Sequence, residues 1–307
     1  MRTRAGLALA LAAAVISGFS VYINSYGVRA FGPAHGGAAV YTTEKNLVAA
    51  VVLALVLVVA GRRAPKEGFT RPRRPAQWAA LAAVAIIGGS VPFVLFFEGL
   101  ARASSANAAF IQKTLVIWVA VLAVPLLRER LTRWHIVAIA GLIVGQAELG
   151  GGLHGIRVGS GEAMILAATL LWAAETIVAR RLLSGLSTLT VATARMGGGV
   201  LILICYTLAT TQWGVLTAAG WAQWSWVLAT GLILAAYVGT WYSALARAGA
   251  IDVTALLVPG AIITALLQSG SKALAPQWPG LVLVAAGAAL VLLAAREGTG
   301  PVQAGIR

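Results

Sequence analysis

Five charged residues lie well inside long apolar stretches of the sequence. They are Glu44, Lys45, Lys113, Glu175 and Arg195. If these stretches cross a bilayer, each charge near its centre costs about 2.5–3.5 kcal/mol on insertion scales. We therefore interpret all five as candidate substrate-binding residues. The three basic side chains could attract an anionic group such as a carboxylate, and either glutamate could neutralise a substrate amine or carry a coupling proton.

The same five residues also have a structural interpretation. Glu44 with Lys113, and Glu175 with Arg195, could form permanent ion pairs between helices, because an unpaired charge is costly in hydrocarbon. Glu44 and Lys45 are adjacent, so they lie about 100° apart around a helix and cannot both face one target. The sequence leaves the functional and the structural interpretation open.

Uncharged side chains form a second group of candidates. Ser20 and Asn24 are four residues apart and share one helix face, which could line a cavity or form hydrogen bonds between helices. Trp172 and Trp241 lie in the middle of their apolar stretches, where an indole could stack on an organic substrate or fill the core. Tyr41 completes the predicted substrate-binding set.

The composition shows which elements must position these residues. Of the 307 residues, 60% are hydrophobic and 10% are charged, against roughly 45–50% and 25% in soluble domains. So few charges cannot cover a soluble globule, and the sequence predicts an all-α polytopic membrane protein. A spanning helix needs about 20 mainly apolar residues. Ten segments qualify: 5–27, 35–60, 77–100, 104–127, 135–151, 160–182, 187–210, 221–246, 252–273 and 278–295.

Lysine and arginine are distributed unequally between the two sides of the predicted membrane. With the N-terminus inside, 16 of the 23 fall on the inner side and 4 on the outer side. The outer four are Arg29, Arg102, Arg157 and Lys272. This bias predicts a multi-pass protein of the cytoplasmic (inner) cell membrane with both termini in the cytoplasm. It also accounts for the net charge of +14, so no nucleic-acid partner is expected.

Metal and cofactor sites have little support in the sequence. The single cysteine, Cys205, and the three histidines give no metal-ligand spacing. No glycine-rich loop carries a phosphate-binding lysine. We expect no cofactor and no metal. The expected partners are a small-molecule substrate, the lipid bilayer and, for coupling, protons or a counter-substrate.

Two short sequence matches indicate an internal repeat. Residues 99–103 (GLARA) match residues 244–248 (ALARA), and residues 76–78 match residues 222–224 as AQW, at offsets of 145 and 146. Each repeat contains five helices, an odd number, so the second half must enter the membrane in the opposite orientation. The sequence therefore predicts two inverted five-helix repeats, residues 1–152 and 153–307, a plan that recurs in transporters.

The stretch from Ser104 to Gly145 resembles the end of an EamA-type repeat of the drug/metabolite transporter superfamily. The matching features are the small residues at 105–109, Glu129, Trp134 and the glycines Gly141 and Gly145. The resemblance extends over the whole chain as two repeats. It implies a ten-helix carrier with a central cavity, in which the fifth and tenth helices are peripheral. Pro259 in the ninth segment is expected to allow a bend that helps to line this cavity.

These observations predict a secondary-active transporter, and not an enzyme. The resemblance favours export of a small metabolite, amino acid or drug-like compound by alternating access around a midplane cavity. One alternative is an intramembrane enzyme acting on lipids, which would need clustered acids, whereas the glutamates here are scattered. Another is a channel or accessory subunit, which would favour repeated polar rings along a pore.

Overall fold

The computed structural model describes residues 2–32, 35–64, 68–103, 105–149, 159–210, 219–269 and 278–297, which contain helices and turns but no strand. The helices are α1 (Arg2–Ala30), α2 (Gly37–Arg63), α3 (Pro75–Ile87), α4 (Val91–Leu100), α5 (Ser105–Lys113), α6 (Leu115–Leu127), α7 (Arg133–Leu149), α8 (Ser160–Leu182), α9 (Thr188–Thr210), α11 (Trp221–Leu245), α12 (Ala250–Ala255), α13 (Gly260–Ser269) and α14 (Trp278–Glu297). Eight spans in this part of the chain are long and apolar enough to cross a membrane, and Ala250–Thr264 is a shorter apolar helical stretch.

The predicted all-α membrane class is confirmed, and the helices follow the ten predicted segments. The predicted boundary between residues 152 and 153 lies outside the described residues, as do Lys66, Arg157, Lys272 and Arg307.

Three of the predicted segments are each broken near the middle. The third is divided into α3 and α4 at residues 88–90, the fourth into α5 and α6 at Thr114, and the ninth into α12 and α13 at residues 256–259. The fourth and ninth segments hold the same position in the two repeats, so these two breaks are related by the internal symmetry.

Glycine, serine and proline account for the break between α3 and α4. The carbonyl of Gly88 accepts a hydrogen bond from the Trp172 indole N–H at 3.1 Å. The Ser90 hydroxyl lies 3.1 Å from the carbonyl oxygens of both Ala85 and Ile86, and so satisfies backbone groups at the end of α3. Pro92 lacks an N–H and fits the first turn of the new helix α4.

The other two breaks have different causes. At the end of α5 the Thr114 hydroxyl donates to the carbonyl of Ile111 at 2.6 Å, which competes with the regular helical pattern. In the ninth segment, Pro259 has no N–H and its ring excludes a regular helix back to residue 255. Helix α12 accordingly ends at Ala255 and α13 begins at Gly260. The bend predicted at Pro259 is confirmed.

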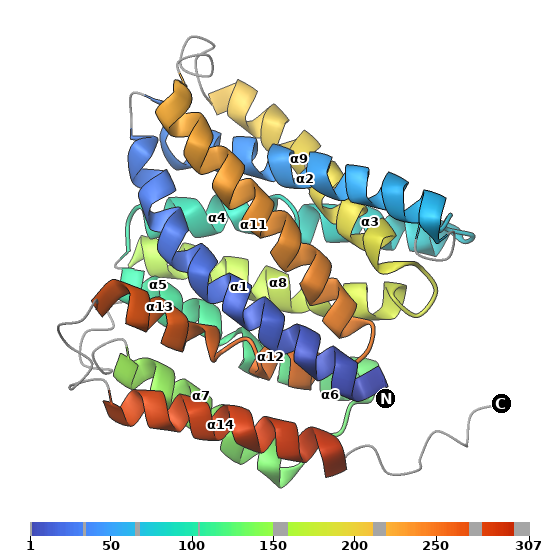
Figure 1. The fold of residues 1–307 in the computed structure, drawn as a ribbon, viewed down its shortest axis with the longest axis vertical. Helices are drawn as coiled ribbons and strands as arrows, with labels where there is room; N and C mark the ends of the chain where they lie inside the picture. The colour runs from blue at the N-terminus through green and yellow to red at the C-terminus, as the bar shows by residue number, and fades with distance from the viewer. Residues whose placement is uncertain are drawn as a thin grey trace.

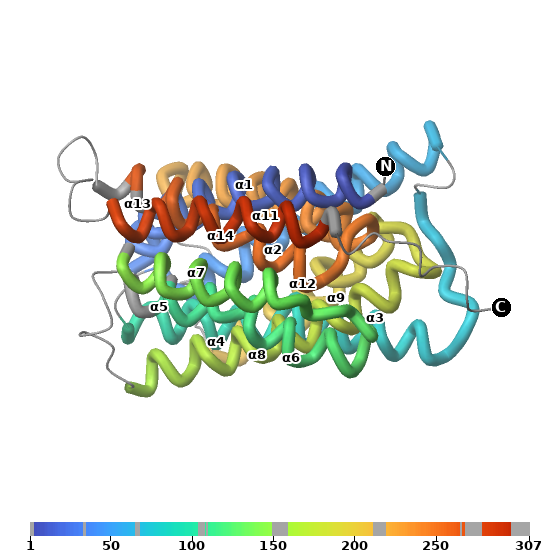
Figure 2. The backbone as a smooth tube through the Cα atoms, turned by 90° about the horizontal axis from the view of Figure 1, so that it is seen from below, coloured from blue at the N-terminus to red at the C-terminus, as the bar shows by residue number. Residues whose placement is uncertain are grey.

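The ten segments alternate in direction along the chain and run between two ends of one bundle (Figure 1). Helix α1 begins and α14 ends at the same end, which we call the terminal face; the opposite end is the distal face. Seen from the side, the helices form two layers, with α1, α11 and α13 in one and α4, α5 and α8 in the other (Figure 2).

The packing repeats itself when the two halves are exchanged. Helix α1 packs on α11, and the equivalent contact in the other half is that of α8 with α3 and α4. Helices α2 and α9 occupy equivalent positions and pack on each other, and so do α7 and α14. Each contact therefore joins equivalent helices or has an equivalent in the other half, as expected for two inverted five-helix repeats. Helices α7 and α14 lie together at one edge of the bundle (Figure 1), peripheral as the resemblance implied.

The sequence matches between the halves have a structural role. Gln77 is the third residue of α3, and its side-chain oxygen accepts the backbone N–H groups of Arg73 at 2.7 Å and Arg74 at 3.3 Å. Gln223 does the same in α11 for the N–H of Gly220 at 3.1 Å. Both glutamines thus satisfy free donors where a helix begins.

At the terminal face, side chains that follow α6 hold the start of α12. The Glu129 carboxylate accepts the backbone N–H of Ala250 at 2.7 Å and of Ile251 at 3.0 Å. His135 Nε2 lies 2.9 Å from Asp252 Oδ1. We call these contacts the terminal clamp. In one repeat the clamp residues Glu129 and His135 lie at the connection between the fourth and fifth segments, and they contact the ninth segment, in the other repeat.

Replacing Glu129 with alanine is expected to lower the free energy of unfolding by about 1–2 kcal/mol, because it removes an acceptor and a negative charge from a helix N-terminus. Chemical unfolding in mixed micelles measures this change. Glu98→Ala is the matched control, since Glu98 pairs with Arg102 at 3.0 Å on the surface and such pairs contribute about 0–1 kcal/mol. Equal losses in the two variants would contradict a specific role for Glu129.

Candidate functional site

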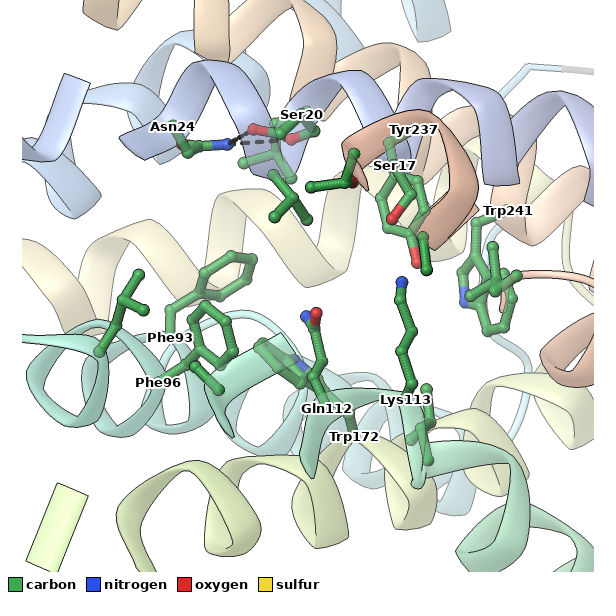
Figure 3. A pocket seen from close by; sticks show the side chains of 18 of the residues that line it. Ser17, Ser20, Asn24, Phe93, Phe96, Gln112, Lys113, Trp172, Tyr237 and Trp241 are labelled. Carbon is green, nitrogen blue, oxygen red and sulfur yellow. Dashed lines mark hydrogen bonds between the residues drawn. The ribbon is translucent and has the colours of Figure 1, made fainter. Parts of the chain in front are cut away.

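A cavity of about 260 Å³ lies in the centre of the bundle. One wall is formed by α1, α11 and α13, and the opposite wall by α4, α5 and α8 (Figure 3). All three helix breaks border it: Phe93 follows the first, Lys113 and Leu115 flank the second, and Leu257 and Val258 lie within the third. The cavity is therefore lined by residues from both predicted repeats.

The cavity extends from the middle of the bundle toward the distal face. Its lining includes Ser25 near the end of α1, Leu100 at the end of α4 and Gln146 near the end of α7. All three helices end at the distal face. At the terminal face, α1 packs closely on the turn after α11, where a Cβ on Gly6 would lie 2.7 Å from the Cβ of Ala248.

Most of the predicted substrate-binding residues meet at this cavity. Its lining includes Ser20, Asn24, Lys45, Lys113, Trp172, Glu175, Arg195 and Trp241. Tyr41 and Glu44 do not line it. Tyr41 is fully buried behind the wall, and its hydroxyl lies 2.7 Å from Asn24 Oδ1. Glu44 is half-buried, and its Oε2 has no hydrogen-bond partner among the described residues.

The position of Glu44 follows from the helix geometry noted in the sequence. Lys45 faces the cavity, and a neighbouring residue on α2 is turned away from it by about 100°. The ion pair between Glu44 and Lys113 that the structural interpretation suggested is not present in the described part of the chain. Glu44 is therefore set apart from the other four deep charges.

Lys113 is the last residue of α5 and reaches into the cavity. Its side chain points toward the wall that carries Tyr237 and Trp241 (Figure 3). Lys113 is only 8% exposed, yet its ammonium group has no hydrogen-bond acceptor and no carboxylate partner within the residues that the structure describes. An ammonium group in such a place favours a negatively charged neighbour.

Lys45 is held by neighbouring groups. Its Nζ donates to Asn24 Oδ1 at 2.8 Å and lies 3.9 Å from the centre of the Phe97 ring, a favourable cation–π distance. Asn24 in turn donates to the backbone carbonyl of Ser20 at 2.8 Å. The polar face of α1 thus forms both a cavity wall and a hydrogen-bonded contact with α2.

Glu175 and Arg195, which line the cavity, form a buried cluster with Tyr242. Arg195 Nε lies 4.0 Å from Glu175 Oε1, and the Tyr242 hydroxyl donates to the same oxygen. The arginine also lies 5.6 Å from the centre of the Phe93 ring. Gly88 lies against this cluster, because a Cβ there would be 3.0 Å from Arg195 Nε. The structure thus brings Glu175 and Arg195 together as a pair between α8 and α9.

Aromatic rings face each other across the cavity. On one wall, the Trp172 indole lies 5.6 Å from the Phe93 ring and 5.5 Å from the Phe96 ring, measured between centroids. On the other wall, Tyr237 and Trp241 are stacked with centroids 6.2 Å apart. These two surfaces can accommodate a flat apolar group between them.

Several lining residues were not predicted as site residues from the sequence. Gln112 precedes Lys113 and points into the cavity beside it (Figure 3). Phe93, Phe96 and Phe97 follow the spacing of a single helix face, which could have identified them. Nothing in the sequence indicated Tyr242, because its role depends on the contact between α8 and α11.

A bundle of inverted repeats that encloses a chamber of charged and aromatic side chains at its broken helices has the architecture of a membrane transporter. The sequence profile of the EamA-like transporter family matches residues 4–147 and 159–293. The chain belongs to this family, and it is a multi-pass membrane transporter of the drug/metabolite type.

The fold is also similar to that of a solved structure titled only "Crystal structure of protein". The two share 16% sequence identity with a TM-score of 0.76, over 96% of this chain and 100% of that one. At this identity the similarity supports the fold alone. None of the curated proteins matches the chain.

Proposed function

We propose that the protein is a secondary-active carrier that exports a small metabolite, amino acid or drug-like compound by alternating access. The observation that carries this proposal is the central cavity, which is shared by both repeats and bordered by the breaks in the fourth and ninth segments. Half-helices that end at a midplane site recur in secondary transporters. The family membership supports the same function.

The two ends of the bundle support a carrier rather than a channel. The cavity reaches the ends of α1 and α4 at the distal face, whereas the terminal clamp and the packing of Gly6 on Ala248 close the terminal face. A site that is accessible from one face at a time is the requirement for alternating access. With both termini in the cytoplasm, this conformation is directed outward.

Coupling to protons is part of the proposal. Glu175 lines the cavity and Glu44 lies one helix position from Lys45, so either carboxylate could take up a proton as the carrier changes state. The acidic side chains are scattered, and among the described residues only Glu175 lines the cavity, which does not favour a lipid-acting enzyme.

Counterflow in proteoliposomes tests the proposal. Vesicles preloaded with a high concentration of an unlabelled solute are expected to accumulate the labelled solute transiently above its external concentration. Only a site that exchanges between the two faces produces this overshoot. Simple equilibration without overshoot would indicate a channel and contradict the proposal. A protonophore should abolish net uphill transport while leaving counterflow intact.

A further inference from the structure

The charges that line the cavity are not balanced. Three basic residues, Lys45, Lys113 and Arg195, face a single acidic one, Glu175. The only other deep carboxylate, that of Glu44, does not line the cavity. Counted formally, the lining therefore carries two more positive than negative groups.

The four charged residues also differ in what satisfies them. Arg195 Nε lies 4.0 Å from Glu175 Oε1, an ion-pair distance, but it has no hydrogen-bond partner among the described residues. The Tyr242 hydroxyl donates to the same carboxylate oxygen. Lys45 donates to Asn24 Oδ1 at 2.8 Å. Lys113 is 8% exposed, and within the described residues nothing accepts its hydrogen bonds. Among the described residues, Lys113 is thus the charged side chain of this lining that has neither a hydrogen-bond acceptor nor a partner of opposite charge.

A buried ammonium group that points into a chamber favours an anion, because charges removed from water are stabilised by a partner of opposite sign. Neutral donors beside it add hydrogen bonds to an oxyanion: the Gln112 amide and the Tyr237 hydroxyl both line the same space. The ammonium group of a cationic or zwitterionic solute would need a free carboxylate. Glu175 supplies the carboxylate in the described lining, and it is already engaged by Tyr242 and Arg195.

The size and the walls of the chamber limit the rest of the ligand. A dry cavity of about 150 Å³ is large enough for benzene, so the cavity of about 260 Å³ accommodates one ring with a polar substituent. The ring would lie between the Phe96 and Trp172 surface and the stacked pair of Tyr237 and Trp241.

We propose that the transported substrate is a small organic anion with a single flat apolar body, and that its anionic head binds the Lys113 ammonium. This inference rests on the proposed carrier function and specifies its substrate class. Carboxylate, sulfonate and phosphonate heads share the chemistry that Lys113 would recognise.

Ligand-induced thermal stabilisation of the purified protein tests the class with matched one-ring probes. Phenylacetate is expected to raise the melting temperature at millimolar concentration, whereas phenylacetamide and phenethylamine, of the same shape but neutral or cationic, are not. Benzenesulfonate and phenylphosphonate distinguish among anionic heads. Stabilisation by the amine or the amide equal to that by the acid, or no stabilisation by any anion, would overturn the inference.

Two variants locate the contact. Lys113→Gln is expected to weaken phenylacetate binding by about tenfold or more, because it removes a charge-assisted hydrogen bond. Lys113→Arg keeps the charge and should retain part of the affinity. Unchanged phenylacetate binding in Lys113→Gln would show that the anion binds elsewhere. If that variant fails to fold, the wild-type probe series still decides the class.

Counterflow with the same probes separates this inference from the proposed function. Counterflow of phenethylamine but not of phenylacetate would overturn the substrate class and leave the carrier function standing. Phenylacetate binding that depends on Lys113, with equilibration but no overshoot, would overturn the carrier function and leave the anion site standing. Counterflow of phenylacetate that is lost in Lys113→Gln would support both.

Discussion

Replacing Arg195 with leucine is expected to lower the free energy of unfolding by about 3–5 kcal/mol, because it leaves the Glu175 carboxylate buried without its charged partner. Arg195 is 6% exposed and Glu175 is 1% exposed, so little water can compensate for the lost guanidinium group. Reversible denaturation in mixed micelles measures this change.

A second substitution shows whether the loss comes from an uncompensated charge. Adding Glu175→Gln to Arg195→Leu removes the isolated carboxylate but keeps a side-chain oxygen that can accept the Tyr242 hydroxyl. We expect the double variant to recover at least half of the lost stability, since removing both charges of a buried pair is often nearly neutral. If the single variant were as stable as the wild type, or the double variant less stable than the single one, the pair would not be ionic.

Replacing Gly199 with alanine is expected to destabilise the protein by about 1–3 kcal/mol, the usual cost of overpacking. Gly199 lies on α9, where it contacts the backbone of the break between α3 and α4: an added Cβ would lie 2.7 Å from the Cα of Gly89. Backbone atoms at such a contact cannot move aside as a flexible side chain can. The melting temperature in detergent, together with the yield of monodisperse protein, reports the change.

Gly197 provides the matched control, two residues away on the same helix. A Cβ added there meets no heavy atom within 4 Å. Alanine has a higher helix propensity than glycine by about 0.8–1.0 kcal/mol, so Gly197→Ala should be neutral or stabilising. Gly199→Ala is therefore predicted to destabilise the protein and Gly197→Ala is not, and a similar loss in both would contradict the close approach of α9 to Gly89.

The sequence was sufficient to predict the helical architecture. Apolar segments of membrane-spanning length are an unambiguous signal, and the GLARA and ALARA matches gave the repeat. The helix breaks were harder to predict. Pro259 indicated one of them, but the break at residues 88–90 depends on the Trp172 indole that satisfies the Gly88 carbonyl, a contact between segments far apart in the sequence.

The candidate site was predictable by residue type, and one of the two suggested ion pairs was correct. Deep charges are rare enough in apolar helices that Lys45, Lys113 and Arg195 could be selected from the sequence. Periodicity also indicated that Glu44 and Lys45 cannot face the same way. Glu175 and Arg195 form the suggested pair, whereas Glu44 and Lys113 form none within the described residues. The partner of Lys45 could not be predicted, because it depends on the contact of Asn24 with α2.

The terminal clamp has a kinetic consequence. Glu129 of the clamp follows the fourth segment. The equivalent connection after the ninth segment, residues 268–276 (QSGSKALAP), contains no acidic residue. Opening the terminal face thus requires breaking the charge-assisted hydrogen bonds of Glu129, for which residues 268–276 contain no equivalent acid. A form that is sparsely populated binds with an apparent affinity reduced in proportion to its population. The half-saturation concentration for transport should accordingly be higher for solute presented at the terminal face than for solute presented at the distal face. The maximal rate from the terminal face should be higher in the same ratio, because transport without a driving gradient cannot shift the final equilibrium of the solute.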